Sequence, residues 1–285
     1  MTITALLLVL TAAFCHATWN FYVKRIGGGV ELIWLISFLS NVFYLPWVIY
    51  IFLVEMPSFG LFEFGCVLVS SVIHTVYFSL LQRGYRHGDL SLVYPLARST
   101  GPVISMTLAV FFLHEVVNAQ IIAGSIIIIT GIFFLTGGFS KRANNVTASI
   151  GYGLVVGFCI GSYTAWDAYV VSVVMVSPVL LDYASNTFRS LFLAPVALRR
   201  REEVRILWRD HRMGVILIGF LSPMAYILFL YAITFTPVTL LAPVRETSVL
   251  ISVLLGSILL GEGHLKQRLI WSVVIVGGVS LLATA

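Results

Sequence analysis

Apolar runs of membrane length follow one another along almost the whole chain and limit it to folds that suit a lipid bilayer. Hydrophobic residues make up 59% of the sequence and charged residues 10%, against roughly 25% charged in a soluble domain. A spanning helix needs about 20 mainly apolar residues. Ten segments fit, at about 4–23, 31–54, 61–82, 90–113, 118–139, 150–172, 178–198, 213–235, 238–260 and 267–284. We therefore expect an all-α polytopic membrane protein with ten transmembrane helices.

The second half of the sequence repeats the first at a constant offset of 147 residues. The coinciding pairs include Trp19 with Trp166, Arg98 with Arg245, Ser105 with Ser252, Glu115 with Glu262 and Gln120 with Gln267. Apolar coincidences arise easily by chance, but matched Trp, Arg, Glu and Gln at one offset do not. We infer an internal duplication within one integrated membrane domain. Residues 1–139 form the first five-helix repeat, 140–149 a cytoplasmic linker and 150–285 the second repeat.

Basic residues mark one side of the membrane. Fourteen of the 17 Lys and Arg residues lie in loops after odd-numbered spans, and the other three, Arg98, Arg189 and Arg245, lie inside spans. The positive-inside rule makes these loops cytoplasmic and predicts both termini on the external side of the inner (cytoplasmic) membrane. Because each repeat has five spans, the second enters the membrane opposite to the first. Such inverted duplications are typical of secondary transporters with a site near the bilayer midplane.

The basic loops also account for the net charge of +5, so the charge gives no reason to expect a nucleic-acid partner. The longest loop, 199–212, mixes charged residues with Ile206, Leu207 and Trp208. This composition fits a short amphipathic helix on the inner membrane surface. The simpler alternative is that the loop only anchors the topology.

Two arginines lie deep inside apolar spans. Arg98 and Arg245 are about seven residues from the ends of their spans, hence roughly 10 Å deep. A guanidinium in hydrocarbon costs roughly 3 kcal/mol, so both should face protein or a watery cavity. Inverted repeats place Arg98 near the inner face and Arg245 near the outer, where each could bind a carboxylate of an anionic or zwitterionic substrate at alternate ends of one pathway. The alternative is that each arginine pairs within the protein.

Four titratable residues inside spans are candidates for proton coupling, namely His16, His74, Asp167 and Glu246. An intramembrane carboxylate is by default a functional hypothesis, and a histidine can titrate near physiological pH. Asp167 is expected close to an interface. The alternatives are that the two acids are permanent counter-ions for Arg189 or Arg245, and that the histidines are hydrogen-bonded packing residues.

Aromatic and amide residues near these charges are candidates for the wall of a substrate cavity. Trp19 and Asn20 on the first span correspond to Trp166 and Asp167 on the sixth. Three tyrosines join them as candidates: Tyr77, Tyr94 and Tyr226. Arg98, Arg245, Glu246 and His74 complete the predicted cavity. Aromatic residues in membrane helices are also common in packing and at interfaces.

Two further patterns point to structural roles. Glu115, at the start of a loop, is expected to accept free amides at the N-terminus of the following helix. Glycines on the fifth and tenth spans supply small faces for close packing between helices or subunits. A homodimer through the fifth and tenth spans is therefore a candidate assembly.

Several functional classes lack any signature here. The sequence contains no GxxxxGK[ST] phosphate-binding loop and no HExxH, His/Cys cluster or nucleophile elbow. We therefore expect no enzyme activity, no cofactor and no bound metal. The three cysteines lie in apolar runs without ligand spacing and are expected to be structural. Transport would have to run on an ion gradient, on exchange or on the gradient of the substrate itself.

The repeated features resemble the EamA-type transporters of the drug/metabolite transporter superfamily. They are ten spans in two five-helix repeats, the Glu115/Gln120 pattern echoed by Glu262/Gln267, and the Pro-then-Arg spans before them. The resemblance covers nearly the whole chain. It implies a basket of helices with spans 1, 3, 4, 6, 8 and 9 towards a central cavity and spans 5 and 10 more peripheral. It also implies export of amino acids or other metabolites on the proton gradient.

One departure limits this comparison. Small multidrug transporters of the same superfamily carry an essential glutamate in their first span, whereas the first span here has no acid. Proton coupling would therefore fall to Asp167, Glu246 or a histidine. We predict a secondary active transporter that exports a small metabolite, such as an amino acid or amphipathic compound, by alternating access. The alternatives are an anion or organophosphate-type exchanger of the same superfamily and a passive small-solute channel.

Overall fold

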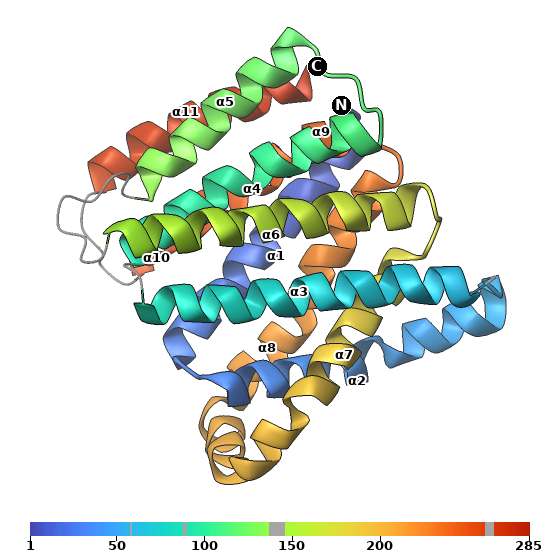
Figure 1. The fold of residues 1–285 in the computed structure, drawn as a ribbon. Coiled ribbons are helices and arrows are strands. Elements are labelled where there is room, and N and C mark those ends of the chain that lie inside the picture. The colour runs from blue at the N-terminus through green and yellow to red at the C-terminus, as the bar shows by residue number, and fades with distance from the viewer. Residues whose placement is uncertain (58, 88–89, 137–145, 260–264) are drawn as a thin grey trace.

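The computed structural model describes residues 1–57, 59–87, 90–136, 146–259 and 265–285. Every regular element in these ranges is a helix (Figure 1). The elements are α1 (Ile3–Ile26), α2 (Val30–Tyr50) with its π-helical end η1 (Ile51–Glu55), α3 (Leu61–His87), α4 (Leu90–Phe112), α5 (Ala119–Leu135), α6 (Val146–Ser172), α7 (Pro178–Arg199), α8 (Arg201–Ile233), α9 (Val238–Arg245), α10 (Thr247–Leu259) and α11 (Leu265–Ala283). They correspond in order to the ten predicted spans, with α2–η1 and α9–α10 each forming one span.

Length and composition support the membrane assignment. Six helical segments are long and apolar enough to cross a bilayer, and three shorter apolar helices lie in α4, α5 and α11. α7 is in neither group because its middle carries Asp182, Asn186 and Arg189. Of the predicted linker 140–149, the last four residues belong to α6, and 140–145 lie outside the described ranges. The side chains of Glu262 and Gln267 also lie outside them.

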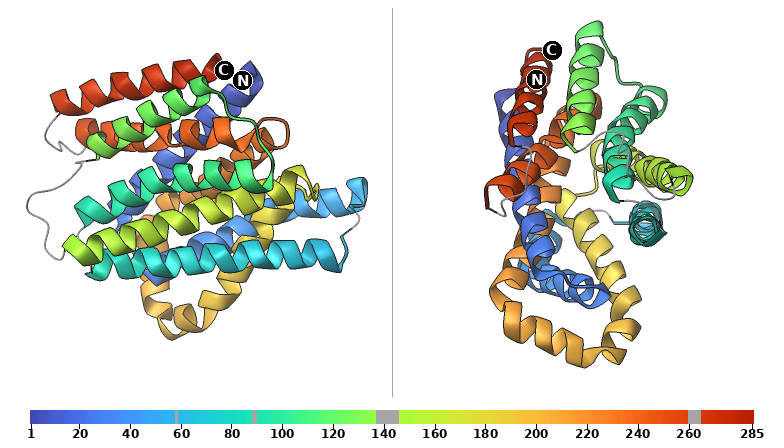
Figure 2. Two further views of the ribbon diagram at one scale, coloured as in Figure 1. Left: turned by 45° about the horizontal axis from the view of Figure 1, so that its top comes forward. Right: turned by 90° about the vertical axis from the view of Figure 1, so that its left-hand side faces the viewer.

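The helix pairings reproduce the sequence duplication in space. α1 packs on α8 as α6 packs on α3, and α4 lies along α6 as α10 lies along α1. Two pairs, α2–α7 and α5–α11, join equivalent helices of the two halves. Figure 2 shows α5 and α11 together at one edge of the molecule and α2 with α7 towards the other. Exchanging the halves leaves these six pairings unchanged, as expected for two copies of one unit related by a twofold axis.

Glycines allow the closest approach between α4 and α6. Gly153, Gly157 and Gly161 lie at four-residue intervals and therefore on one face of α6. A Cβ on Gly161 would lie 2.5 Å from the Cγ2 atom of Ile104 and 2.8 Å from the backbone nitrogen of Ser105. The glycine faces predicted from the sequence lie on other spans, and this stripe was not predicted. Its effect is to hold α6, with its polar side chains, directly against α4.

The predicted glycine faces of α5 and α11 pack against each other within one chain. A Cβ on Gly124 would lie 2.8 Å from Leu282 Cγ, and one on Gly278 would lie 3.0 Å from the Gly124 carbonyl oxygen. Gln120 adds side-chain hydrogen bonds to the Leu281 carbonyl and the Thr284 hydroxyl, both 2.9 Å. These glycines thus serve intramolecular packing, and a second copy would have to use other faces of the two helices.

Glu115 caps a different helix from the one expected. Its two carboxylate oxygens accept hydrogen bonds from the Val238 and Thr239 amides, each at 2.8 Å, at the start of α9. α5, the following helix, is capped instead by Asn118, whose side chain accepts from the Ile121 amide at 2.8 Å. A carboxylate from the first half therefore completes a helix of the second.

Replacing Glu115 by alanine should destabilise the protein by about 2 kcal/mol, because two amides of α9 lose a charged acceptor at the positive end of the helix dipole. Thermal unfolding in detergent measures the loss. Glu63→Ala is the matched control, since Glu63 accepts one amide, that of Gly60, at the exposed start of α3. Equal shifts in melting temperature for the two variants would contradict the special role of Glu115.

α8 is longer than the predicted eighth span. It begins at Arg201, and its non-helical residue His211 (φ −130°, ψ 21°) separates a short first helix from the spanning part. The predicted loop 199–212 is thus largely helical, as its composition indicated. Val204 and Leu207 pack with Leu32 and Leu35 of α2. This contact, with an ion pair between Arg200 and the buried Glu31 at the start of α2, fixes this end of the molecule.

The predicted single span 238–260 is broken in the middle. α9 ends at Arg245 and α10 begins at Thr247, with Glu246 (φ −68°, ψ −7°) between them. Pro243 has no amide hydrogen for the helical ladder, and the amide of Glu246 bonds to the Pro243 carbonyl at 3.1 Å. At membrane depth such a break is tolerated only inside protein or beside water. It therefore marks the interior of the molecule.

Candidate functional site

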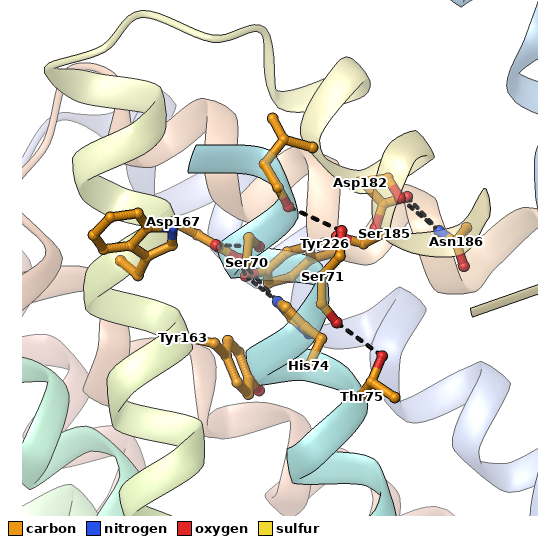
Figure 3. A network of polar contacts seen from close by, with 12 residues as sticks. Ser70, Ser71, His74, Thr75, Tyr163, Asp167, Asp182, Ser185, Asn186 and Tyr226 are labelled. Carbon is orange, nitrogen blue, oxygen red and sulfur yellow. Dashed lines mark hydrogen bonds and ion pairs between the residues drawn. The ribbon is translucent and has the colours of Figure 1, made fainter. Parts of the chain in front are cut away.

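A buried carboxylate forms the first part of the site (Figure 3). Asp167 on α6 is fully buried. It accepts a hydrogen bond from Ser70 Oγ at 2.5 Å and one from His74 Nε2 at 2.9 Å, both from α3. The hydroxyl of Tyr226 on α8 also donates to Asp167. α3 and α8 cover Asp167 from both sides, so its carboxylate lies inside the protein.

Helical spacing explains how these groups meet. Ser70 and His74 are four residues apart on α3, and Tyr163 and Asp167 are four apart on α6, so each pair shares one helix face. The His74 ring stacks on Tyr163 with 4.1 Å between centroids. Tyr226 approaches the same histidine edge-on at 5.5 Å. The result is a carboxylate–histidine pair with an aromatic wall.

The second part of the site is an ion pair between the two halves. Arg98 on α4 lies 3.5 Å from the carboxylate of Glu246, at the break between α9 and α10. Its other terminal nitrogen donates to His16 Nε2 on α1 at 3.1 Å. The Tyr94 ring lies 5.6 Å from the guanidinium. Glu246 is thus paired with Arg98 and not with Arg189 or Arg245, because the helix break turns it towards the other half.

Arg245 has a different environment from Arg98. It is 9% exposed, donates to the Tyr163 hydroxyl at 3.3 Å, and lies over the rings of Phe229 and Tyr226 at 4.5 and 5.5 Å. Within the described part of the chain it forms no ion pair. Arg245 is therefore a buried cation stabilised by the faces of two aromatic rings and by one hydroxyl.

The contacts of the two arginines are related by the duplication. Arg98 bonds to His16, and the same offset of 147 residues takes this pair to Arg245 and Tyr163, which are also bonded. Arg98 also reaches the second half directly, since it contacts Glu246, the residue next to Arg245. The two repeats cross at this level, so equivalent side chains converge on one cluster.

A small cavity adjoins the cluster. Its volume is about 10 Å³, enough for about one water molecule. It is lined by Gly101, Pro102, Ser105, Ile160, Thr164, Ala242, Arg245 and Glu246. This cavity is too small to hold a metabolite.

The remaining predicted wall residues divide into two groups. Tyr77 packs edge-on against Tyr163 at 5.4 Å, and Trp19 packs edge-on against His16 at 5.0 Å, so both line the cluster. Trp166 does not, because its indole donates to the Cys66 carbonyl and lines an apolar surface groove of about 620 Å³. Asn20 bonds to the His16 carbonyl of its own helix and contributes no side chain to the Asp167 network.

Three residues of the site were missed by the sequence analysis, namely Ser70, Tyr163 and Phe229. The four-residue spacing of Ser70 from His74 and of Tyr163 from Asp167 was a signal for the first two. Phe229 had none, because an isolated phenylalanine in an apolar span is indistinguishable from lipid-facing neighbours. No cluster of three or more His, Cys, Asp or Glu side chains able to hold a metal occurs in the described ranges.

Comparison with known proteins adds independent evidence. A model of the EamA-like transporter family matches residues 3–137 and 147–284, one match for each half. A solved structure titled "Crystal structure of protein" has a TM-score of 0.75 at 16% identity, covering 100% of this chain and 98% of that chain, and shows the fold. No curated protein matches the sequence. Ten helical units, membrane-length apolar helices and a family match on both halves lead to one conclusion: the chain belongs to the EamA-like transporter family and is a multi-pass membrane transporter, not an enzyme.

Proposed function

We propose that this protein is a proton-coupled secondary transporter that exports a small metabolite, such as an amino acid or an amphipathic compound, by alternating access. The observation that carries the proposal is the placement of a buried carboxylate–histidine pair beside a buried arginine without a carboxylate partner among the described residues. The first can exchange protons and the second can bind an anionic group of the substrate.

Tyr163 connects the two parts of the site. Its ring stacks on His74, and its hydroxyl accepts from Arg245. A proton on the Asp167–His74 pair changes the charge beside this ring and thereby the field at the arginine. Substrate and proton sites in such contact influence each other's occupancy through a shared free energy of coupling. His16 and Glu246, which contact Arg98, are the other candidate proton carriers.

The proposed arrangement in the membrane follows from charge. We place the protein in the inner (cytoplasmic) membrane with both termini outside, the linker 140–149 inside, and residues 1–139 and 150–285 as inverted repeats. A homodimer would use the outward faces of α5 and α11, where Ile126 and Val273 are 58% and 73% exposed. Lipid covers these faces in a monomer.

A second candidate is an anion exchanger, which the two buried arginines favour. Exchange predicts uptake that saturates and is stimulated by substrate on the opposite side. A passive channel predicts flux that neither saturates nor responds to a pH gradient. Flux into proteoliposomes, measured with and without a pH gradient, separates the three functions.

Arg245→Ala should lower substrate affinity and transport by about 100-fold, because a bound anionic group loses a desolvated charged donor. Arg245→Lys should recover part of the loss, since lysine keeps the charge but not the planar fork. Arg205→Ala is the control, as Arg205 is an exposed arginine of α8. Normal transport by both Arg245 variants would contradict the proposed role.

A further inference from the structure

Arg98, Arg245 and Glu246 form a central cluster that contains two cations and one anion. Arg98 and Arg245 are both 9% exposed, and Glu246, the carboxylate between them, is 3% exposed. Asp167 contacts Ser70, His74 and Tyr226, and within the described residues it forms no ion pair with either arginine. Burying an unbalanced charge is costly, so the cluster is preorganised for one further negative charge.

The duplication shows where that charge belongs. The offset that relates Arg98 to Arg245 relates Glu246 to Ser99. The second half thus supplies a carboxylate to the arginine of the first, whereas the first half supplies only a serine in return. The Ser99 hydroxyl is buried and has no hydrogen-bond partner among the described residues. If the repeat relation holds for these side chains, the position equivalent to the Glu246 carboxylate is on the Arg245 side of the cluster.

The surroundings of Arg245 define the rest of the ligand. The small cavity lies between Arg245 and Glu246. The guanidinium lies over the rings of Phe229 and Tyr226 and donates to the Tyr163 hydroxyl. A carboxylate on the arginine would therefore carry an apolar or aromatic body against these rings, while a second carboxylate would meet Glu246.

On the basis of the proposed transport function, we propose that the site takes a substrate with a single carboxylate, held by Arg245, and that Glu246 excludes a second carboxylate by occupying Arg98. Glu246 is then a specificity-determining residue. Glu246 repels a second carboxylate and keeps Arg98 occupied. Repulsive elements of this kind let binding sites reject close analogues of their ligands.

Equilibrium binding to the full-length protein in detergent tests this assignment. The probes are phenylacetate and 1,4-phenylenediacetate, which share a ring and differ by one carboxylate. The wild type should bind the monoacid at least about tenfold more tightly than the diacid. Glu246→Gln keeps an acceptor for Arg98 but removes the charge, and should reverse this preference. Glu31→Gln makes the same change in another arginine-paired carboxylate and should retain the wild-type preference.

A second variant tests the Arg245 side of the cluster directly. Ser99→Asp puts a carboxylate at the position equivalent to Glu246, so it should weaken phenylacetate binding at least about tenfold without lowering the melting temperature. An unchanged preference in Glu246→Gln, undiminished binding in Ser99→Asp, or a wild type that prefers the diacid or binds neither probe would overturn the assignment. These measurements report binding without any gradient, so they test the carboxylate site separately from transport. If the protein binds neither probe but transports a cationic or neutral substrate, the carboxylate site is refuted and the transport function stands.

Discussion

Asp167→Asn should abolish proton-driven transport while leaving the protein folded. Asparagine has the shape of aspartate and keeps one acceptor oxygen, which can still accept from Ser70 or from Tyr226. It cannot exchange a proton with His74. Transport driven by a pH gradient should therefore fall by a factor on the order of 100, as when a positioned proton-transfer group is removed. Exchange of labelled for unlabelled substrate at equal pH requires no net proton movement and should persist.

Comparison of the two assays in one proteoliposome preparation separates loss of coupling from loss of folding. Asp182→Asn is the matched control, because Asp182 is a buried carboxylate on α7 that accepts from Asn186 of its own helix. It should behave as the wild type in both assays. If Asp167→Asn still accumulates substrate against its gradient, the coupling group lies elsewhere, with His16 and Glu246 next to be tested.

Gly161→Ala should produce the largest loss of stability by a single methyl group. The added Cβ would overlap Ile104 and approach the backbone of Ser105, so α4 and α6 would have to separate. Overpacking of this kind costs about 1–3 kcal/mol. The backbone atom prevents relief by a side-chain rotation, so we expect about 3 kcal/mol, measured by thermal unfolding in detergent.

Gly151→Ala provides a control on the same helix. A Cβ at Gly151 meets no atom within 4 Å. Alanine is the better helix former by about 1 kcal/mol, so this variant should be neutral or slightly stabilised. If Gly161→Ala lowers the melting temperature and Gly151→Ala does not, the loss of stability arises from the contact between α4 and α6. A stable Gly161→Ala protein would mean that α4 and α6 can shift without cost.

The sequence was sufficient to predict the elements of the fold because membrane helices have a strong local signature. Ten apolar runs and one repeat offset predicted the ten helical units in their order. The break at Glu246 was not predicted, since Pro243 lies in a run that is otherwise uniformly apolar. The stripe of Gly153, Gly157 and Gly161 was missed because glycine spacing alone does not identify the helix it meets.

The candidate site was only partly predictable. Arg98, Arg245, Glu246, Asp167, His74 and Tyr226 were identified individually, because polar groups in apolar runs are conspicuous. Their partners depend on how the two halves cross, which no local pattern encodes. The contact of Arg98 with Glu246, for example, could not be inferred from the depth of either residue along its own helix. Phe229 belongs to the site only because it contacts Arg245, and that contact is visible only in the structure.

The Arg98–Glu246 pair joins positions 148 residues apart in the chain. At about 5–20 residues per second, the ribosome completes α4 roughly 7–30 s before it reaches Glu246. During that interval the nascent first half carries a guanidinium that costs roughly 3 kcal/mol in hydrocarbon and whose carboxylate has not been made. α4 should therefore stay at the lipid–water boundary or with the insertion machinery until the second half arrives. A polypeptide truncated before residue 246 should accordingly be recognised as incompletely inserted and removed by membrane proteolysis.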